Sequence, residues 1–182
     1  MRLLEENEKV PWILLFLLSW LLFALLADRR RLGVVWWTGP TAVVLQLLVD
    51  TCAIESGYYR IEDPVVSLYG SSLFFTCGPV LSMGALFGMY LPRGPLARTI
   101  NVLVWAGIFC AMEYLLLGCG ALVYLNWSKA ASTAIDLMVF TVLTWIGGLR
   151  DDGEFCQPTG TDNRVAFRRQ NSPSEERTRV PA

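Results

Sequence analysis

The chain of 182 residues contains no histidine. Histidine is the commonest metal ligand and the usual acid–base group near neutral pH, so its absence argues against many classes of enzyme at once. The five cysteines follow no CxxC or other metal-ligand spacing, and the sequence has no GxSxG, P-loop or HExxH motif. We therefore expect no enzymatic activity, no catalytic residues, no bound metal and no cofactor.

Charge is also scarce along most of the chain. Charged residues make up 17% of the total and the formal net charge is −1, and there is neither a basic helix nor an aromatic RNA-binding motif. Nucleic acid is therefore not an expected partner. Hydrophobic residues make up 54% of the chain and the mean hydropathy is +0.44, which exceeds ordinary globular usage.

The hydrophobic residues form five blocks, and about 20 apolar residues are enough for a helix to cross a bilayer. This pattern predicts an all-α fold, an integral membrane bundle of about five transmembrane helices over residues 1–149, surrounded by the lipid bilayer. The predicted helices cover residues 10–27, 33–54, 65–91, 99–125 and 130–149. Residues 150–182 are polar and poor in branched apolar side chains, so they are predicted to form a disordered cytoplasmic tail.

The basic residues between the blocks predict the orientation of the bundle. Basic residues concentrate on the cytoplasmic side of membrane proteins, and here they fall mainly on one side of the predicted helices. That side carries Arg29, Arg30, Arg31, Arg93, Arg98 and Arg150. We therefore predict a multi-pass protein of the cell membrane with its N-terminus outside and its C-terminus in the cytoplasm. The acidic leader and the positive cluster after the first block favour a retained helix over a cleaved signal peptide.

Three acids lie inside the predicted helices: Glu113 near the midpoint of the fourth, and Asp50 and Asp136 in the outer third of the second and fifth. A charged side chain at mid-membrane costs about 2.5–3.5 kcal/mol on insertion scales, and no Lys, Arg or His lies in any block. The acids must then be protonated, hydrated or bound to a cation. We favour protonated acids in an intramembrane polar site, bonded to serines and to Gln46 and Asn101.

Small residues predict where the helices touch. Helical steps of three, four and seven residues place one set on a single face of the fourth helix, which should point into the bundle: Ala106, Cys110, Glu113 and Gly120. In the third helix Gly84 and Gly88 form a GxxxG pair, and Gly78 precedes a proline that should kink the helix. These three glycines are predicted packing residues. Buried cysteines are expected as small apolar side chains, with a Cys52–Cys119 disulfide as the alternative.

Four residues also carry a resemblance to a known family: Asp50, Glu113, Tyr124 and Trp127. Over roughly residues 34–148 the chain resembles small, uncharacterised multi-pass membrane proteins of endospore-forming bacteria. That family has four or five helices, an acid in the penultimate helix and a Tyr-x-x-Trp turn, which here reads YLNW. The chain departs from the family at Phe75-Thr76, where an aromatic–Asp pair is expected, and in its longer polar tail. The resemblance implies a membrane location and no known activity.

Two functions follow from these observations. The leading prediction is a non-enzymatic membrane protein that acts through helix or partner contacts in the bilayer, with a second copy or another membrane protein as its partner. The alternative is a small cation or proton permease that uses the three intramembrane carboxylates. The two differ in whether the acids lie dry between helices or face a hydrated cavity.

Overall fold

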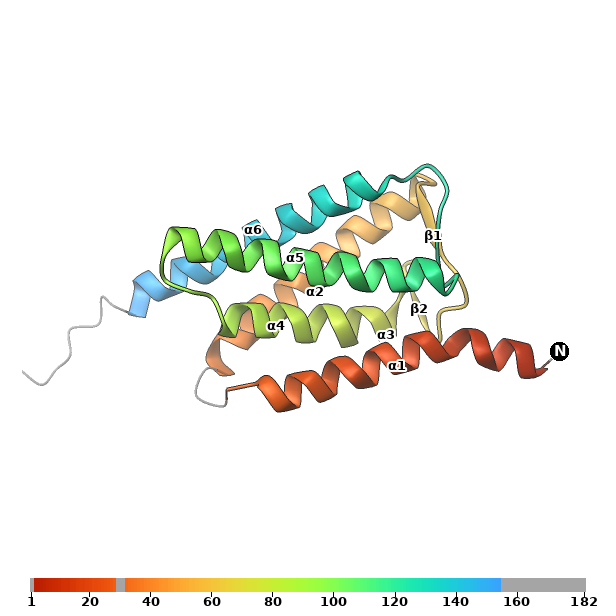
Figure 1. The fold of residues 1–182 in the computed structure, drawn as a ribbon, viewed down its shortest axis with the longest axis horizontal. Coiled ribbons are helices and arrows are strands. Elements are labelled where there is room, and N and C mark those ends of the chain that lie inside the picture. The colour runs from red at the N-terminus through yellow and green to blue at the C-terminus, as the bar shows by residue number, and fades with distance from the viewer. Residues whose placement is uncertain (1, 29–31, 155–182) are drawn as a thin grey trace, which may run out of the picture. The chain divides into compact units, whose positions relative to one another are not determined.

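The computed structural model describes residues 2–28 and 32–154, with side chains at residues 10–28, 33 and 37–148. The chain is mostly helical, as predicted, and its helices form five rods (Figure 1). They are α1 (Arg2–Leu26), α2 (Leu32–Glu55), a third rod built from α3 (Leu73–Phe75), η2 (Thr76–Val80) and α4 (Leu81–Met89), α5 (Pro95–Gly118) and α6 (Lys129–Glu154). Residues 155–182, most of the predicted tail, lie outside the described residues.

Three of the helices are long and apolar enough to cross a membrane, namely Trp37–Glu55, Pro95–Gly118 and Lys129–Gly148. Two further apolar helices, Val10–Leu26 and Leu73–Met89, are shorter. Two bounds differ from the prediction at the chain ends. α1 already begins at Arg2, and α6 continues to Glu154, so the first residues of the predicted tail belong to a helix.

The prediction of one helix over residues 65–91 is wrong in its first part. Strands β2 (Ser67–Leu68) and β3 (Ser71–Ser72) pair there as an antiparallel hairpin. Its two turn residues, Tyr69 and Gly70, have φ values of +50° and +82°, as a type I′ turn requires. The helical rod begins only at Leu73. Its π-helical turn η2 surrounds Pro79, which lacks the N–H that a regular helix would use, so an irregularity occurs at the predicted kink.

The predicted helix over residues 99–125 is also misplaced at both ends. α5 starts at Pro95, a residue suited to the first helical turn, and ends at Gly118. Beyond that end, Gly120 has a φ of +73°, and Ala121 N donates to Leu116 O at 3.0 Å. Gly120 N donates to Leu117 O at 3.2 Å, which completes a Schellman motif. Gly120 therefore terminates the helix and is not part of its predicted small-residue face.

α2 ends in the same way. Gly57 has a φ of +70°, and the two bonds of a Schellman motif run from Tyr58 N to Ala53 O and from Gly57 N to Ile54 O. Each of these two glycines redirects the chain into a strand: β1 (Tyr59–Ile61) follows α2, and β4 (Leu122–Tyr124) follows α5. The strands pair antiparallel, with Tyr59 opposite Tyr124, and form a two-stranded ribbon. The fold therefore contains short strands besides its helices, and the all-α prediction did not include these strands.

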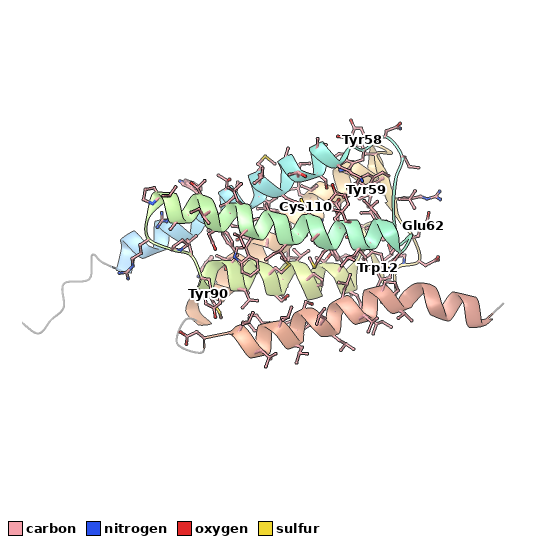
Figure 2. The ribbon with its side chains drawn as sticks, viewed as in Figure 1. Trp12, Tyr58, Tyr59, Glu62, Tyr90 and Cys110 are labelled. Carbon is pink, nitrogen blue, oxygen red and sulfur yellow. The ribbon has the colours of Figure 1, made fainter. Side chains whose placement is uncertain are left out.

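The ribbon defines one end of the bundle, here called the ribbon end; the opposite end, with the α4–α5 connection at residues 90–94, is called the loop end (Figure 1). α1 contacts the rest of the chain near both ends. Trp12 Nε1 donates to Glu62 O at 3.3 Å at the ribbon end, and Tyr90 OH donates to Leu26 O at 2.6 Å at the loop end. Figure 2 shows Trp12, Tyr59 and Glu62 at the first end and Tyr90 at the other.

Glycines bring α1, α2 and the third rod together at short range. A Cβ on Gly84 would lie 2.5 Å from Ala42 Cβ and 3.2 Å from Thr38 O of α2. A Cβ on Gly88 would overlap the buried Thr38 side chain. Gly78 contacts α1, because an added Cβ would lie 2.9 Å from Phe16 Cδ2. The three glycines predicted as packing residues thus all lie at helix contacts.

Large aromatic rings, by contrast, join α5 and α6 to the third rod. The rings of Phe87 and Phe140 lie 5.1 Å apart between centroids, and those of Phe75 and Phe109 lie 5.7 Å apart. Phe109 also contacts Phe140 at 6.3 Å. We call Phe75, Phe87, Phe109 and Phe140 the aromatic layer. It lies between the α5–α6 pair and the closely packed helices.

Candidate functional site

Asp50 is the most buried of the three acids, with 2% of its surface exposed. It lies near the end of α2 and accepts hydrogen bonds from three donors. Gln46 Nε2 donates to Oδ1 at 2.8 Å, Ser71 Oγ donates to Oδ2 at 2.5 Å, and Tyr59 OH also donates to Oδ1. A carboxylate has two oxygens that can accept about four bonds, so both oxygens of Asp50 are satisfied within the protein.

The local turns explain why these donors reach Asp50. Gln46 precedes Asp50 by one helical turn, so both side chains lie on one face of α2. The Schellman motif at Gly57 turns the chain back along the helix and returns Tyr59 to Asp50. The β2–β3 hairpin supplies Ser71, whose Oγ also lies 3.5 Å from Thr76 Oγ1 of the π-helical turn. Three separate elements therefore meet at one carboxyl group.

Glu113 occupies the corresponding place near the end of α5. Its Oε1 accepts a bond of 2.5 Å from Tyr124 OH of β4 and another of 2.5 Å from Ser132 Oγ of α6. One turn further along α6, the buried Asp136 accepts a bond of 3.3 Å from Cys110 Sγ of α5. Glu113 and Asp136 thus join α5 to α6.

The ribbon places the two phenols next to each other. The bond from Glu62 N to Ala121 O (3.0 Å) and the bond from Leu125 N to Tyr58 O (2.9 Å) flank the pair Tyr59–Tyr124. These bonds make it a non-hydrogen-bonded pair, the kind whose side chains lie closer together. Each phenol donates to the acid of the helix before its own strand. We call Asp50, Tyr59, Glu113 and Tyr124 the phenol–carboxyl cluster.

Burial raises the pKa of Tyr59 above its ordinary value, and the nearby Asp50 and Glu113 raise it further. Burial also raises the pKa of Tyr124, together with its bond to Glu113. A raised pKa favours the neutral phenol, so both tyrosines remain protonated donors throughout the neutral range. The cluster therefore has two fixed donors facing two carboxyl acceptors.

The structure brings most of the predicted polar residues to the ribbon end. Gln46 bonds to Asp50, and Glu113 lies near Asp136. Asn101 lies elsewhere: its Oδ1 accepts a bond of 3.2 Å from Trp105 Nε1 in the first half of α5, and it bonds to none of the three acids. The placement of Glu113 at the midpoint of its helix is also wrong, because α5 ends at Gly118.

Serines were predicted as partners of the acids, and Ser71 and Ser132 are the serines that bond to them. The two phenol donors, Tyr59 and Tyr124, were not predicted from the sequence. Ser71 was assigned to a helix, and Tyr124 was noted only through the YLNW resemblance. The glycines at 57 and 120 were the available signal, since each turns the chain back along its own helix into a strand. The strand after Gly57 brings Tyr59 to α2, and the strand after Gly120 brings Tyr124 to α5.

The chemistry available to the cluster is hydrogen bonding and proton binding. In the part of the chain that the structure describes, no group of three or more His, Cys, Asp or Glu is arranged to hold a metal ion. Asp50, Glu113 and Asp136 bond there to hydroxyl, amide and thiol groups, while Arg60 pairs with Glu62 instead. Cys52 and Cys119 are both free, so the alternative of a disulfide between them is wrong.

No protein-family model, curated protein or solved structure matches the chain. The resemblance to the bacterial membrane family therefore stays a prediction from the YLNW turn and the acids.

Proposed function

We propose that the chain is a multi-pass membrane protein whose five helical rods all cross the bilayer, with the ribbon end outside and the loop end in the cytoplasm. The support is the apolar surface. In the most apolar 18 residues of each long helix, the share buried inside the protein is only 17% for Pro95–Gly118, 22% for Lys129–Gly148 and 28% for Trp37–Glu55. Surfaces of this size and composition are rare on soluble proteins, and lipid would cover them. The arginines of the 27–31 and 90–94 connections support a cytoplasmic loop end, because basic residues concentrate on the cytoplasmic side of membrane proteins.

The topology is tested with reporters fused at the two ends. A reporter after Arg150 should register as cytoplasmic, and one inserted at Glu62, beside the ribbon, should register as external. An alkaline phosphatase and a fluorescent protein fusion at each position give complementary signals. In the proposed topology three rods cross the membrane between Glu62 and Arg150, so the two reporters should lie on opposite sides. If both register on the same side, the five-rod topology is wrong.

Within this placement the chain acts without catalysis, through contacts between its helices and a second copy of itself. The observation that carries this proposal is the outward face of α5. Gly107, Ala111 and Gly118 lie on one side of that helix, all three are exposed, and a Cβ added at Gly107 or Gly118 would meet no atom within 4 Å. Most of the other glycines inside the bundle contact a neighbouring helix. Small residues on a membrane helix permit close approach of another helix, so this face suits self-association.

Replacing Gly107 by leucine should weaken self-association on the order of tenfold, about 1.4 kcal/mol, because the side chain separates the two α5 helices. Single-molecule photobleaching of labelled protein in liposomes at several densities gives the fraction of dimers. The matched control is Gly33→Leu, since Gly33 of α2 is likewise exposed and a Cβ added there would meet no atom within 4 Å. Dimers that persist in Gly107→Leu, or a parent that stays monomeric at every density, would exclude this interface.

A cation or proton permease is the second candidate. Its support is that three carboxyl groups gather at one end and bond to hydroxyl, amide and thiol groups rather than to Lys or Arg within the described residues. Against it stands the burial of Asp50, whose oxygens are already bonded to three protein donors. A transported cation would have to displace those donors. The geometry therefore favours the contact function.

A further inference from the structure

The chain order divides the bundle into two groups of helices. The first group is α1, α2 and the third rod, formed by the chain up to Met89; the second is the α5–α6 hairpin, which starts at Pro95. The chain passes from one group to the other once, through residues 90–94 at the loop end. There α6 contacts the connection itself, because a Cβ on Gly147 of α6 would lie 2.8 Å from Leu91 Cδ2.

At the ribbon end the two groups meet only through non-covalent contacts of the described residues. β1 belongs to the first group and β4 to the second, and their backbone bonds join the groups. The Trp127 ring adds contacts to Tyr58 and Tyr59, at 5.4 and 5.6 Å between centroids. The phenol–carboxyl cluster then fixes each strand to its own helix, through Asp50 in α2 and Glu113 in α5. We call the β1–β4 ribbon together with this cluster the latch.

Between the ends, the two groups meet at the aromatic layer. In water, parting these rings would be opposed by the hydrophobic effect. In a bilayer, acyl chains can cover the exposed rings, so parting them costs mainly lost packing. The first group is held differently, because glycines bring its backbones into direct contact. In lipid the boundary at the aromatic layer therefore lacks the backbone contacts that hold the first group, and the polar latch contributes most to its closure.

We propose that the α5–α6 hairpin opens from the other helices at the ribbon end, with residues 90–94 as the hinge. The latch is the β1–β4 ribbon, which joins the two groups and which the two phenol–carboxyl bonds hold to α2 and to α5. This inference rests on the proposed membrane placement. Opening separates Tyr59 from Tyr124 and admits water to Asp50 and Glu113, while the loop end stays closed. A rotation of about 10° would move the far end of a 24-residue helix by about 6 Å.

Pulsed electron–electron double resonance on protein in liposomes tests the opening. Nitroxide labels replace exposed leucines in a chain whose native cysteines are changed to serine. One pair reports the ribbon end, at Leu48 of α2 (60% exposed) and Leu115 of α5 (63%). The other reports the loop end, at Leu25 of α1 (72%) and Leu96 of α5 (74%). Resistance to carbonate extraction, measured on the same samples, shows separately whether the membrane placement holds.

In the double variant Tyr59→Phe/Tyr124→Phe the ribbon-end distance should lengthen by about 5 Å or gain a second, longer population, and the loop-end distance should stay unchanged. Phenylalanine keeps the rings and removes only the two hydroxyl donors, so each strand of the ribbon loses its side-chain bond to its own helix. An unchanged ribbon-end distance would overturn the latch, and equal broadening of both pairs would overturn the hinge. If the double variant does not fold, the single variant Tyr124→Phe, which keeps the Tyr59–Asp50 bond, must show a smaller lengthening at the ribbon end; no lengthening there overturns the proposal.

Discussion

Replacing Gly84 by alanine should destabilise the folded protein by about 2 kcal/mol. The new Cβ would lie 2.5 Å from Ala42 Cβ and 3.2 Å from the backbone oxygen of Thr38, so α2 and α4 would have to separate. Overpacking of this kind usually costs 1–3 kcal/mol, which exceeds the gain of up to about 1 kcal/mol from the higher helix propensity of alanine. Far-UV circular dichroism during unfolding in mixed detergent micelles measures the change.

Gly107→Ala is the matched control for Gly84→Ala. It makes the same chemical change inside a helix, but the added Cβ meets no atom within 4 Å. We expect this variant to be unchanged or more stable by up to about 1 kcal/mol. Equal stability of the two variants would show that α2 and α4 are not in backbone contact at Gly84.

Replacing Asp50 by leucine should destabilise the protein by about 3 kcal/mol, since it leaves Gln46, Tyr59 and Ser71 without their acceptor. Each unsatisfied buried donor costs about 1–3 kcal/mol in soluble proteins and less in membranes. Glu113→Leu should cost less, about 0.6–2 kcal/mol, because that acid is only partly buried and has two donors.

The corresponding amide variants separate a hydrogen-bonding role from a charge role. Asp50→Asn keeps one acceptor oxygen and places an amide beside Ser71 Oγ, which can rotate and accept. We expect a loss of no more than about 1 kcal/mol, and we expect Glu113→Gln to be tolerated for the same reason. Cation-dependent uptake into proteoliposomes that disappears in the folded Asp50→Asn variant would contradict a purely structural role and favour the permease.

Hydropathy predicted the helices well where the apolar block and the helix coincide. The second predicted helix, residues 33–54, matches α2 at Leu32–Glu55, because polar residues bound that block on both sides. It failed at residues 65–72, just before a helical rod, and at residues 119–125, just after a helix, where the chain forms short strands. Hydropathy does not distinguish a buried helix from a short strand. The glycines with positive φ mark where a helix ends, but a hydrophobic pattern does not show their conformation.

The candidate site was predictable only within single helices. The i, i+4 spacing of Gln46 and Asp50 predicts their proximity, and the structure shows the bond. Tyr59 and Tyr124 come together through the pairing of two strands that are far apart in the sequence, and Ser71 through a hairpin that was taken for a helix. Such contacts depend on tertiary register, which one sequence does not specify. Asn101 does not join the acids because it lies 12 residues before Glu113 in α5, which is about 18 Å along the helix.

The two shorter apolar helices, Val10–Leu26 and Leu73–Met89, lie side by side, since α1 contacts α3, η2 and α4. With no more than 17 residues each, their apolar lengths are about 26 Å, whereas the 24 residues of α5 extend about 36 Å. A typical hydrocarbon core is about 30 Å thick, and each Å of mismatch costs a fraction of a kcal/mol. A bilayer around this bundle would thin beside α1 and α4, so the protein should partition into thinner regions of a membrane.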